Sequence, residues 1–317
     1  MRTRLSRRSF IQQSALATAG AAIIPSAIYA GKNFPAGNPV RLGGPVFGKF
    51  DDPVKWVKAV KSLKYSAANC PLEPGASDEL IRSYSSEAKK NNILIAEVGV
   101  WNNMLDPDEI AREAAIKKNI VSLQLADRIG ACCCVNISGA KGEIWDGPYP
   151  GNYSKETFDQ IVETVRHIID QAKPENTFFA LEPMPYMLPD SPDTYLDLVK
   201  AIGRDHFAVH LDPVNMISSP QRYFNNTAFL RECFAKLGPY IKAVHAKDIT
   251  IMPELTVHLE ERRPGLGCID YAVFLQEMSK LKDIPMMMEH LDKPEDYNLA
   301  AEYIRKIGSE NGIRFVE

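Results

Sequence analysis

The chain has 317 residues, 45% of them hydrophobic, which is ample for a sizeable buried core. Its formal net charge is −3, from 40 acidic and 37 basic residues. This mildly acidic balance argues against a nucleic acid or an anionic lipid surface as the partner.

Residues 1–30 are predicted to be a twin-arginine signal peptide. The segment 6–12 reads SRRSFIQ, a mildly apolar stretch follows at 15–24, and Ile28-Tyr29-Ala30 offers a cleavage site. The alternative is a chance arginine pair in an ordinary secretory signal. The apolar stretch is too short and too weak to span a membrane, and no cysteine after the cleavage site indicates a lipid anchor. We therefore expect a periplasmic or otherwise exported protein without a stable membrane anchor.

From residue 31 onward, short apolar segments alternate with helix-length segments. The predicted strands are 40–47, 65–72, 93–101, 131–138, 177–182, 207–212, 241–245 and 284–289. The predicted helices are 53–63, 78–91, 108–129, 155–171, 192–202, 227–237, 271–282 and 297–309. The longest connection, 249–268, is expected to be a loop. Such alternation indicates a parallel sheet, and eight repeats without a break in composition predict an α/β fold, a single (β/α)8 TIM barrel over residues 31–317.

The six cysteines do not have the spacing of a zinc ribbon or a thioredoxin-like motif. Three of them, Cys132, Cys133 and Cys134, are adjacent in one predicted strand. We expect the cysteines to act as small apolar core residues. One disulfide remains possible, and the sequence does not indicate which two cysteines would form it.

Four predicted strands in the second half of the chain end on a potential metal ligand: Glu182, Asp212, His245 and Glu289. Barrel enzymes carry their chemistry at the carboxyl ends of the strands, and the alternation of side chains points these four inward. A single carboxylate there usually caps a helix or forms a surface ion pair, but four on successive strands indicate a shared site. Three carboxylates and one imidazole suit a divalent ion, with Mn²⁺ favoured and Mg²⁺, Co²⁺ or Zn²⁺ as alternatives.

Five pieces of this sequence resemble the xylose-isomerase-like TIM barrels, also called sugar phosphate isomerases/epimerases. They are ALEPMPY (180–186), HLDPVN (210–215), VHAKD (244–248), GLGCID (265–270) and MEH (288–290). The resemblance covers essentially all of residues 31–317. It implies that Glu182, Asp212, His245 and Glu289 bind the metal. It also implies that Glu182 and Glu289 are catalytic and move the proton from opposite faces of the substrate.

One position departs from the pattern of the ketose epimerases in this family. They usually carry a histidine three residues after the aspartate of the sixth strand, where this chain has Asn215. Asparagine can hydrogen-bond a hydroxyl but cannot take up a proton at neutral pH. This puts strict 3-epimerisation of ketoses in doubt and leaves metal binding unaffected.

Four residues are candidate substrate contacts: Trp101, Asn136, Asn215 and Lys247. Trp101 could stack on a sugar or be a core residue, Asn136 could face the mouth or cap a turn, and Lys247 could reach a substrate oxygen or lie on the surface. His290 is expected to face away from the barrel axis. Arg262 and Arg263 are expected to be solvated.

The predicted function is a metal-dependent sugar isomerase or epimerase that abstracts a proton next to a carbonyl of a free sugar or sugar derivative. A 3-keto-glycoside lyase would use the same metal and base, and a non-catalytic sugar-binding barrel is the alternative from another class. The apurinic-site endonucleases share the fold, but their histidine-rich three-metal cluster and basic groove do not fit this acidic chain. The expected partner is a small sugar rather than a nucleic acid, and a homo-oligomer is compatible with the sequence.

Overall fold

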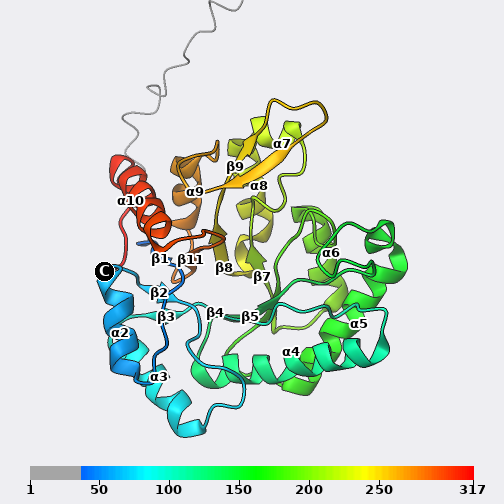
Figure 1. Cartoon of the computed structure of the whole chain (residues 1–317), viewed down its shortest axis with the longest axis horizontal. Helices are drawn as coiled ribbons and strands as arrows, with labels where there is room; N and C mark the ends of the chain where they lie inside the picture. The colour runs from blue at the N-terminus through cyan, green and yellow to red at the C-terminus, as the bar shows by residue number, and fades with distance from the viewer. Residues whose placement is uncertain (1–36) are drawn as a thin grey trace, which may run out of the picture. The chain divides into compact units, whose positions relative to one another are not determined.

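The structure, a computed structural model, describes residues 37–317, so the predicted signal peptide at residues 1–30 lies outside the described range. Parallel strands occupy the centre and the helices surround them (Figure 1). The strands are β1 (Arg41–Gly43), β2 (Ala67–Ala68), β3 (Leu94–Ile95), β4 (Glu97–Gly99), β5 (Cys133–Asn136), β6 (Phe179–Leu181), β7 (Phe207–Leu211), β8 (Ile241–Ala246), β9 (Asp248–Ile251), β10 (Leu259–Arg262) and β11 (Pro285–Met288). The helices are α2 (Pro53–Ser62), α3 (Asp78–Lys90), α4 (Glu109–Ile129), α5 (Lys155–Ala172), α6 (Pro192–Ile202), α7 (Pro220–Phe224), α8 (Asn226–Leu237), α9 (Tyr271–Met278) and α10 (Pro294–Glu310).

The main sheet closes on itself. Its strands follow the order β3-β2-β1-β11-β8-β7-β6-β5-β4, and their pairing is parallel throughout. The two ends of this order, β3 and β4, are separated in the chain only by Ala96. They are therefore two halves of one extended segment, which pairs with β2 on one side and with β5 on the other. The predicted TIM barrel is confirmed.

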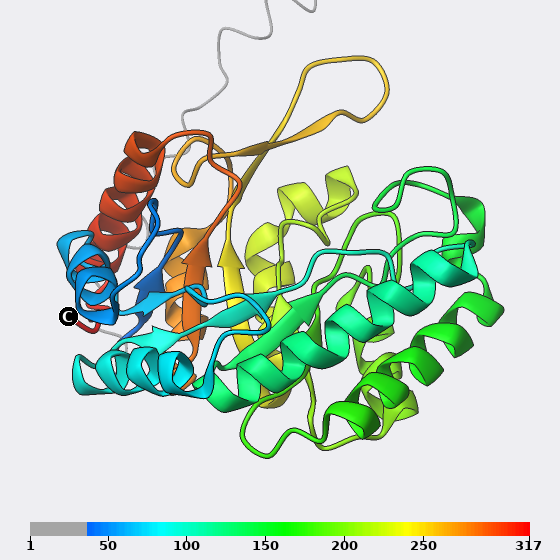
Figure 2. The ribbon, with the colours of Figure 1, turned by 60° about the horizontal axis from the view of Figure 1, so that its bottom comes forward.

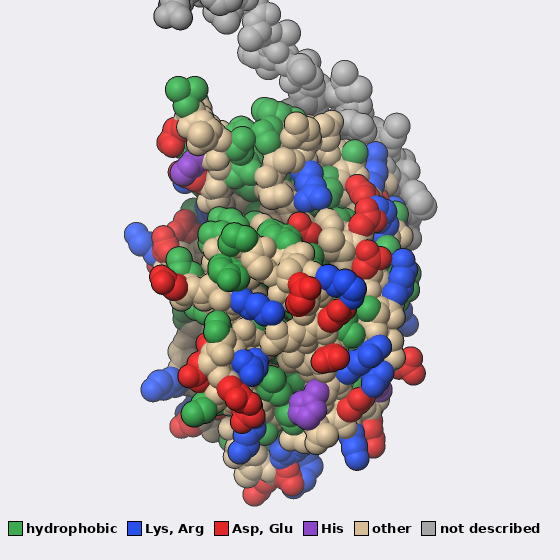
Figure 3. Space-filling view, turned by 90° about the vertical axis from the view of Figure 1, so that its right-hand side faces the viewer, with side chains coloured by type: hydrophobic (Ala, Val, Ile, Leu, Met, Phe, Trp, Pro, Cys, Tyr) green, Lys and Arg blue, Asp and Glu red, His purple; other side chains and the backbone are tan. Residues whose placement is uncertain are grey.

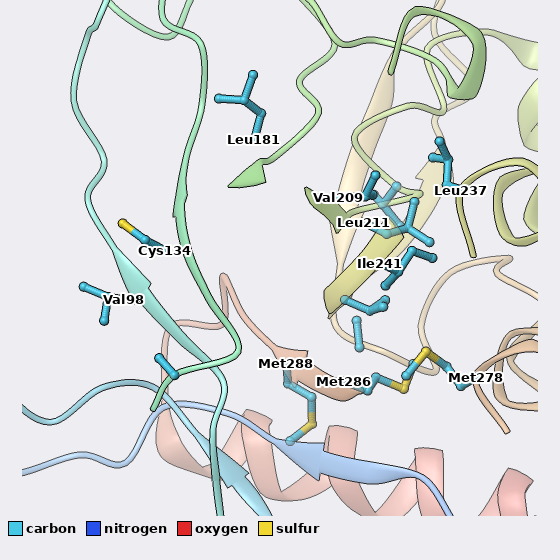
Figure 4. Close-up of a cluster of buried hydrophobic side chains, with 14 of the residues drawn as sticks. Val98, Cys134, Leu181, Val209, Leu211, Leu237, Ile241, Met278, Met286 and Met288 are labelled. Carbon is cyan, nitrogen blue, oxygen red and sulfur yellow. The ribbon is translucent and has the colours of Figure 1, made fainter. Parts of the chain in front are cut away.

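Side chains alternate between the barrel interior and the layer under the helices. Leu181 and Cys134 belong to the large cluster that packs between strands and helices (Figure 4). Their neighbours Ala180 and Cys133 belong to a small interior cluster. The interior residues are small, which leaves room for polar side chains inside the barrel.

The helices begin close to where the sequence predicts because their caps are local. In α2, the Asp52 carboxylate accepts hydrogen bonds from the backbone N–H groups of Val54 (2.7 Å) and Lys55 (3.0 Å). In α6, Ser191 and Thr194 form a capping box, and Gly203 ends the helix in the left-handed conformation. Each helix thus returns the chain to the amino-terminal end of the next strand.

The region predicted as a long loop at 249–268 contains an antiparallel hairpin, β9 and β10, that projects from the barrel (Figure 2). Thr250 faces Glu260 across this ladder, and Asp248 faces Arg262. The segment lacks a tight-turn signature and regular alternation, so its pairing is not evident from the sequence. The short helix α7 was also not predicted.

All six cysteines are free, so the disulfide left open by the sequence does not form in this structure. Within residues 37–317, no helix is both long enough and apolar enough to cross a membrane. Acidic and basic side chains are interspersed over the face shown in Figure 3.

Candidate metal centre

The four predicted ligands come from four neighbouring strands. Glu182, Asp212 and Glu289 directly follow β6, β7 and β11, and His245 lies near the end of β8. In the sheet these strands are adjacent, in the order β11-β8-β7-β6. Because the strands are parallel, their carboxyl ends meet at one rim of the barrel, and the four side chains converge there.

The convergence is close. One ligand atom from each of the four residues lies within 4.8 Å of the others. His245 Nδ1 is 3.0 Å from Glu182 Oε1, 2.8 Å from Glu289 Oε1 and 4.0 Å from Asp212 Oδ2. Asp212 and His245 are wholly buried, and Glu289 is the most exposed member, with 15% of its side chain accessible.

This donor set fits a divalent ion. Ligands about 2.1 Å from an octahedral ion lie about 3.0 Å from one another, which is close to the distances from His245 Nδ1 to the two glutamate oxygens. Asp212 Oδ2 and Glu289 Oε1 are buried without a hydrogen-bond partner. The Lys247 ammonium lies at ion-pair distance from both oxygens, and a divalent cation held by the four residues would balance the remaining carboxylate charge.

Lys247 is buried next to this set. Its ammonium nitrogen lies 2.9 Å from Asp212 Oδ2 and 2.7 Å from Glu289 Oε1. These are ion-pair distances, although the two oxygens do not accept a hydrogen bond of good geometry. Burial alone would lower the pKa of Lys247, but the surrounding carboxylates, Asp212 first, raise it well above 10.5. In the ion-free protein Lys247 is therefore a cation that offsets part of the carboxylate charge.

The ligand side chains have displaced pKa values. Burial would raise the pKa of Glu289, but the charges of His245 and Lys247 lower it well below 4.5. Burial and the charge of Glu289 raise the pKa of Glu182. Burial would lower the pKa of His245, but the carboxylates of Glu289, Glu182 and Glu97 raise it well above 6.5. In the ion-free protein a proton on His245 thus balances part of the negative charge.

A second polar cluster lies in the barrel interior. Glu97, from β4, places Oε2 2.7 Å from His210 Nε2 and Oε1 3.5 Å from His245 Nε2. All three residues are buried. Burial would raise the pKa of Glu97, but the charges and hydrogen bonds of His245 and His210 lower it to about 2. Glu97 is the member of this network that the sequence did not single out, although it is the one charged residue in the predicted strand 93–101.

Two of the four predicted substrate contacts lie at the centre. Asn215 donates through Nδ2 to Glu182 Oε1 (3.2 Å) and accepts through Oδ1 from Lys247 Nζ (3.2 Å). Asn215 therefore links a ligand carboxylate to the buried lysine.

Trp101 lies on the opposite side of the mouth, two residues after β4. Its side chain is 40% exposed, and its backbone adopts a positive φ of 43°, which is uncommon for a bulky residue. Trp101 and Glu97 help to line a cavity of about 200 Å³. The other residues that line it are Asn69, Cys70, Leu72, Glu73, Pro74, Val98 and Gly99. The cavity thus adjoins the network that contacts His245.

The prediction for Asn136 is wrong. Asn136 is wholly buried, and its Nδ2 donates to Asn102 Oδ1 (2.8 Å) and Asn119 Oδ1 (3.1 Å). Its Oδ1 accepts from the backbone N–H groups of Asn102 and Ile137. All donors and acceptors of the Asn136 side-chain amide are thus hydrogen-bonded within the protein. Asn136 fixes the loop after β4 and has no donor or acceptor left for a substrate.

His290 was expected to face away from the barrel axis, and it does not. Its φ of 55° directs the ring toward Lys247, whose Nζ is 3.2 Å from His290 Nδ1. Glu261, from the hairpin strand β10, lies 3.4 Å from Lys247 Nζ and 3.3 Å from His290 Nδ1. Strand alternation failed for His290 because the strand had already ended, and Glu261 depends on a hairpin that was not predicted.

Asp248 has a structural role. Its two carboxylate oxygens accept hydrogen bonds from the backbone N–H groups of Ile249, Gly265, Gly267 and Ile269. A Cβ at position 267 would lie 2.3 Å from Asp248 Oδ1, so this close approach requires glycine. The motifs VHAKD and GLGCID therefore belong to one structure, which fixes the loop after the hairpin beside the metal centre.

Comparisons with known proteins agree with this geometry. The sequence profile of the family described as "Xylose isomerase-like TIM barrel" matches residues 57–307. No curated protein matches the chain significantly. Among solved structures, a xylose isomerase-like TIM barrel protein from Mycobacterium smegmatis in complex with magnesium has a TM-score of 0.60 at 17% identity, covering 86% of this chain and 96% of that one.

Two further structures of similar fold have different activities. A 3-keto-D-glucoside 4-epimerase from E. coli has a TM-score of 0.59 at 13% identity, covering 84% of this chain and 99% of that one. Endonuclease IV from Thermus thermophilus has a TM-score of 0.66 at 15% identity, covering 85% of this chain and 99% of that one. At these identities the similarity establishes the fold and leaves the reaction open. This chain belongs to the xylose isomerase-like TIM barrel family.

Proposed function

We propose that this protein is a divalent-metal-dependent sugar isomerase or epimerase that abstracts a proton next to a carbonyl group. The observation that carries the proposal is the convergence of Glu182, Asp212, His245 and Glu289, with one ligand atom of each within 4.8 Å of the others. The two buried oxygens without hydrogen bonds, on Asp212 and Glu289, support it. Mn²⁺ is the proposed ion, with Mg²⁺, Co²⁺ or Zn²⁺ as alternatives.

A bound divalent ion would supply Lewis-acid polarisation of the substrate carbonyl. The proton is moved by the chain itself, through the carboxylates of Glu182 and Glu289. Their strands, β6 and β11, lie on either side of the β7–β8 pair, so the two carboxylates approach the mouth from different sides. Such a pair can remove a carbon-bound proton on one face and return it on another. The low pKa of Glu289 keeps its carboxylate ionised for this task.

The cavity beside Trp101 supports a sugar as the substrate. A half-exposed indole offers an apolar face to a sugar ring, and Asn69 and Glu73 on the same cavity wall can hydrogen-bond hydroxyl groups. The residues that line this cavity include two carboxylates and neither lysine nor arginine. This charge favours a neutral sugar or glycoside over a sugar phosphate, because a phosphate needs cationic partners.

A 3-keto-glycoside lyase is the second candidate, and Asn215 favours it. This residue occupies a position where the ketose epimerases of the family usually carry histidine, and its amide is engaged by Glu182 and Lys247. An amide cannot take up a proton, so the return of a proton to carbon would depend on Glu182 and Glu289 alone. Loss of a leaving group next to the abstracted proton requires no second proton transfer to carbon, so elimination is compatible with this site.

The test is turnover by the metal-loaded protein. Purified protein with Mn²⁺ is incubated with ketoses and with 3-keto-glycosides, and the products are separated by chromatography. A changed sugar configuration supports the isomerase or epimerase, and release of the aglycone supports the lyase. Solvent deuterium must appear at the reacting carbon in the first case. Absence of turnover by the ion-loaded protein with both substrate classes would contradict the proposal.

Replacement of Glu182 separates an enzyme from a non-catalytic sugar-binding barrel. Glu182→Gln removes a candidate base with little change in shape. An enzyme loses turnover, whereas a binding protein keeps its sugar affinity and has no turnover to lose. Lys155→Gln is the control, because Lys155 lies on an exposed helical turn and pairs only with Asp159.

We also propose that residues 1–30 export the folded protein. The proposal is supported by the SRRSFIQ segment at 6–12. A fusion of residues 1–36 to a reporter that is active only after export in the folded state tests it. Replacement of Arg7 and Arg8 by lysine is expected to abolish export, and unaffected export would indicate another route.

A further inference from the structure

The imidazole of His245 has two nitrogens, and each faces a different partner. Nδ1 faces the metal centre, 2.8 Å from Glu289 Oε1. Nε2 faces the barrel interior, 3.5 Å from Glu97 Oε1. We propose that Glu97 is a positioning residue, which accepts the Nε2 proton of His245 and so presents Nδ1 as the ligand atom. The inference rests on the metal-binding part of the proposed function and is independent of the reaction.

Glu97 suits this role because an ionised carboxylate only accepts hydrogen bonds. Its second oxygen, Oε2, lies 2.7 Å from His210 Nε2. His210 Nδ1 is buried without a partner, so a proton there would be unsatisfied and the proton belongs on Nε2. Glu97 Oε2 therefore accepts the N–H of His210, and this bond holds the carboxylate with Oε1 3.5 Å from His245 Nε2.

The position of Glu97 is fixed by its backbone. Its carbonyl oxygen accepts a hydrogen bond from the backbone N–H of Cys70 (2.9 Å), and in the sheet it pairs with Cys133. The carboxylate thus projects from a segment that is tied to β5 and to the chain just after β2. Carboxylates that hold the outer nitrogen of a metal-binding histidine set its tautomer and ring orientation, and their loss typically costs 10–100-fold in metal affinity.

A different interpretation is that Glu97, His210 and His245 hold a second cation, because their ligand atoms also lie within 4.8 Å of one another. The 2.7 Å contact between His210 Nε2 and Glu97 Oε2 is a hydrogen-bond distance. Because the proton of His210 belongs on Nε2, this nitrogen has no lone pair available to bind a cation. The proposal accordingly requires one ion per chain, and two ions per chain would contradict it.

The wild-type protein provides the first test. Histidine labelled with ¹⁵N is observed by NMR in the ion-free protein and in the protein loaded with Mg²⁺, and the His245 signals are assigned with His245→Asn. The expected result is an Nε2–H on His245 in both states and an Nδ1 that carries no proton in the loaded state. An Nε2 without its proton, or a proton on Nδ1 of the loaded protein, overturns the proposal. This measurement does not depend on whether a variant folds.

The second test is the affinity of Glu97→Gln for Mn²⁺, measured by titration calorimetry. In Glu97→Gln, the amide oxygen can accept a hydrogen bond from one of the two imidazoles, His210 or His245. The NH₂ group then faces the N–H of the other imidazole, donor against donor, so that imidazole must move its proton to its other nitrogen. We expect the Kd for Mn²⁺ to rise 10–100-fold. Glu277→Gln is the matched control, since Glu277 is a buried carboxylate on α9 that pairs with Lys280 outside the site. An unchanged Kd in Glu97→Gln, or an equal rise in Glu277→Gln, would show that Glu97 does not position the ligand.

The two tests keep this inference apart from the proposed function. If the wild-type protein binds Mn²⁺ but shows no turnover, the proposed enzymatic activity is contradicted. The role of Glu97 is then decided by comparing the Mn²⁺ affinities of the wild type and of Glu97→Gln. Wild-type protein that binds no divalent ion contradicts the metal centre. That result would also overturn the role of Glu97, because a residue that positions a metal ligand requires the metal.

Discussion

The ammonium nitrogen of Lys247 lies 2.9 Å from Asp212 Oδ2, and both side chains are buried at the mouth of the barrel. Glu289 Oε1 lies 2.7 Å from the same nitrogen. Two carboxylates of the metal centre thus share one fixed positive charge. With three carboxylates, a neutral imidazole, one ammonium and a divalent cation, the charges of the ion-loaded centre sum to zero.

Replacement of Lys247 by methionine should destabilise the ion-free protein more than the ion-loaded protein. Loss of one partner of a buried ion pair typically costs about 3–5 kcal/mol, because the remaining charges stay buried and unpaired. Without Lys247, the single charge of protonated His245 leaves most of the carboxylate charge unbalanced in the ion-free protein, whereas a bound divalent cation adds two positive charges. Urea unfolding with and without Mn²⁺ measures the difference.

The control for this prediction is Lys236→Met. Lys236 pairs with Asp193 and Glu232 near the surface, where an ion pair contributes about 1 kcal/mol or less. Its effect should be small and independent of Mn²⁺. Equal destabilisation of Lys247→Met with and without the ion would show that the lysine does not neutralise the metal ligands.

Metal affinity should increase with pH. The pKa of His245 is raised well above 6.5 in the ion-free protein, so at neutral pH a proton must leave the ring before Nδ1 can bind a cation. Below that pKa the proton competes with the ion and weakens binding; above it the competition ends. Lys247 is protonated in the ion-free protein, because its pKa is raised well above 10.5.

Calorimetric titration with Mn²⁺ in two buffers of different ionisation enthalpy measures the protons released on binding. Close to one proton per ion is expected at pH 7. His258→Asn serves as a control, since the half-exposed ring of His258 lies on the hairpin near Glu254 and Glu260, away from the four candidate ligands. Binding that neither releases a proton nor depends on pH would be inconsistent with His245 as a ligand.

The helices and the convergence of the four candidate metal ligands were predictable from the sequence because their signals are local. Asp52, Ser191 and Gly203 mark helix ends within a few residues, and Asp212 directly follows an apolar strand. Strand ends in a parallel barrel share one rim, so the position of each ligand along its own strand was enough to predict that they meet.

The remaining parts of the site depend on contacts between segments far apart in the chain. Glu97 and His245 are brought together across the barrel interior, and Glu261 comes within 3.4 Å of Lys247 because β10 pairs with β9, which follows Lys247 in the chain. Asn136 was misassigned because its partners, Asn102 and Asn119, come from other elements. No local pattern reports such pairings.

Asp248→Asn should destabilise the loop beside the metal centre. Its two oxygens each accept two backbone N–H groups, and an asparagine amide would place donors against two of them. A buried unsatisfied donor costs about 1–3 kcal/mol, so a loss of about 2–4 kcal/mol in the free energy of unfolding is expected. Hydrogen exchange should show Gly265 and Gly267 losing protection.

Asp159→Asn is the control for Asp248, because Asp159 pairs only with Lys155 on an exposed helical turn and should change stability by less than about 1 kcal/mol. If Asp248→Asn unfolds at the wild-type urea concentration with unchanged exchange at Gly265 and Gly267, its carboxylate does not hold the loop.

The six thiols should react slowly in the folded protein. Burial raises the pKa of Cys70 to about 11 and that of Cys132 to about 12, and Cys133, Cys134 and Cys233 are buried. The reactive thiolate is therefore scarce at pH 7.5. A chromogenic thiol reagent should label few thiols in the native protein. In denaturant without reductant it should label six thiols per chain. Fewer than six in denaturant would reveal a disulfide that the structure does not contain.

The most direct test of the metal centre is the number of divalent ions bound per chain. Protein stripped with a chelator is reconstituted with Mn²⁺, dialysed and subjected to elemental analysis, beside an Asp212→Asn variant whose circular dichroism confirms its fold. The account predicts one ion per wild-type chain and a large loss in the variant. Folded wild-type protein that takes up no Mn²⁺, Mg²⁺, Co²⁺ or Zn²⁺ would contradict it.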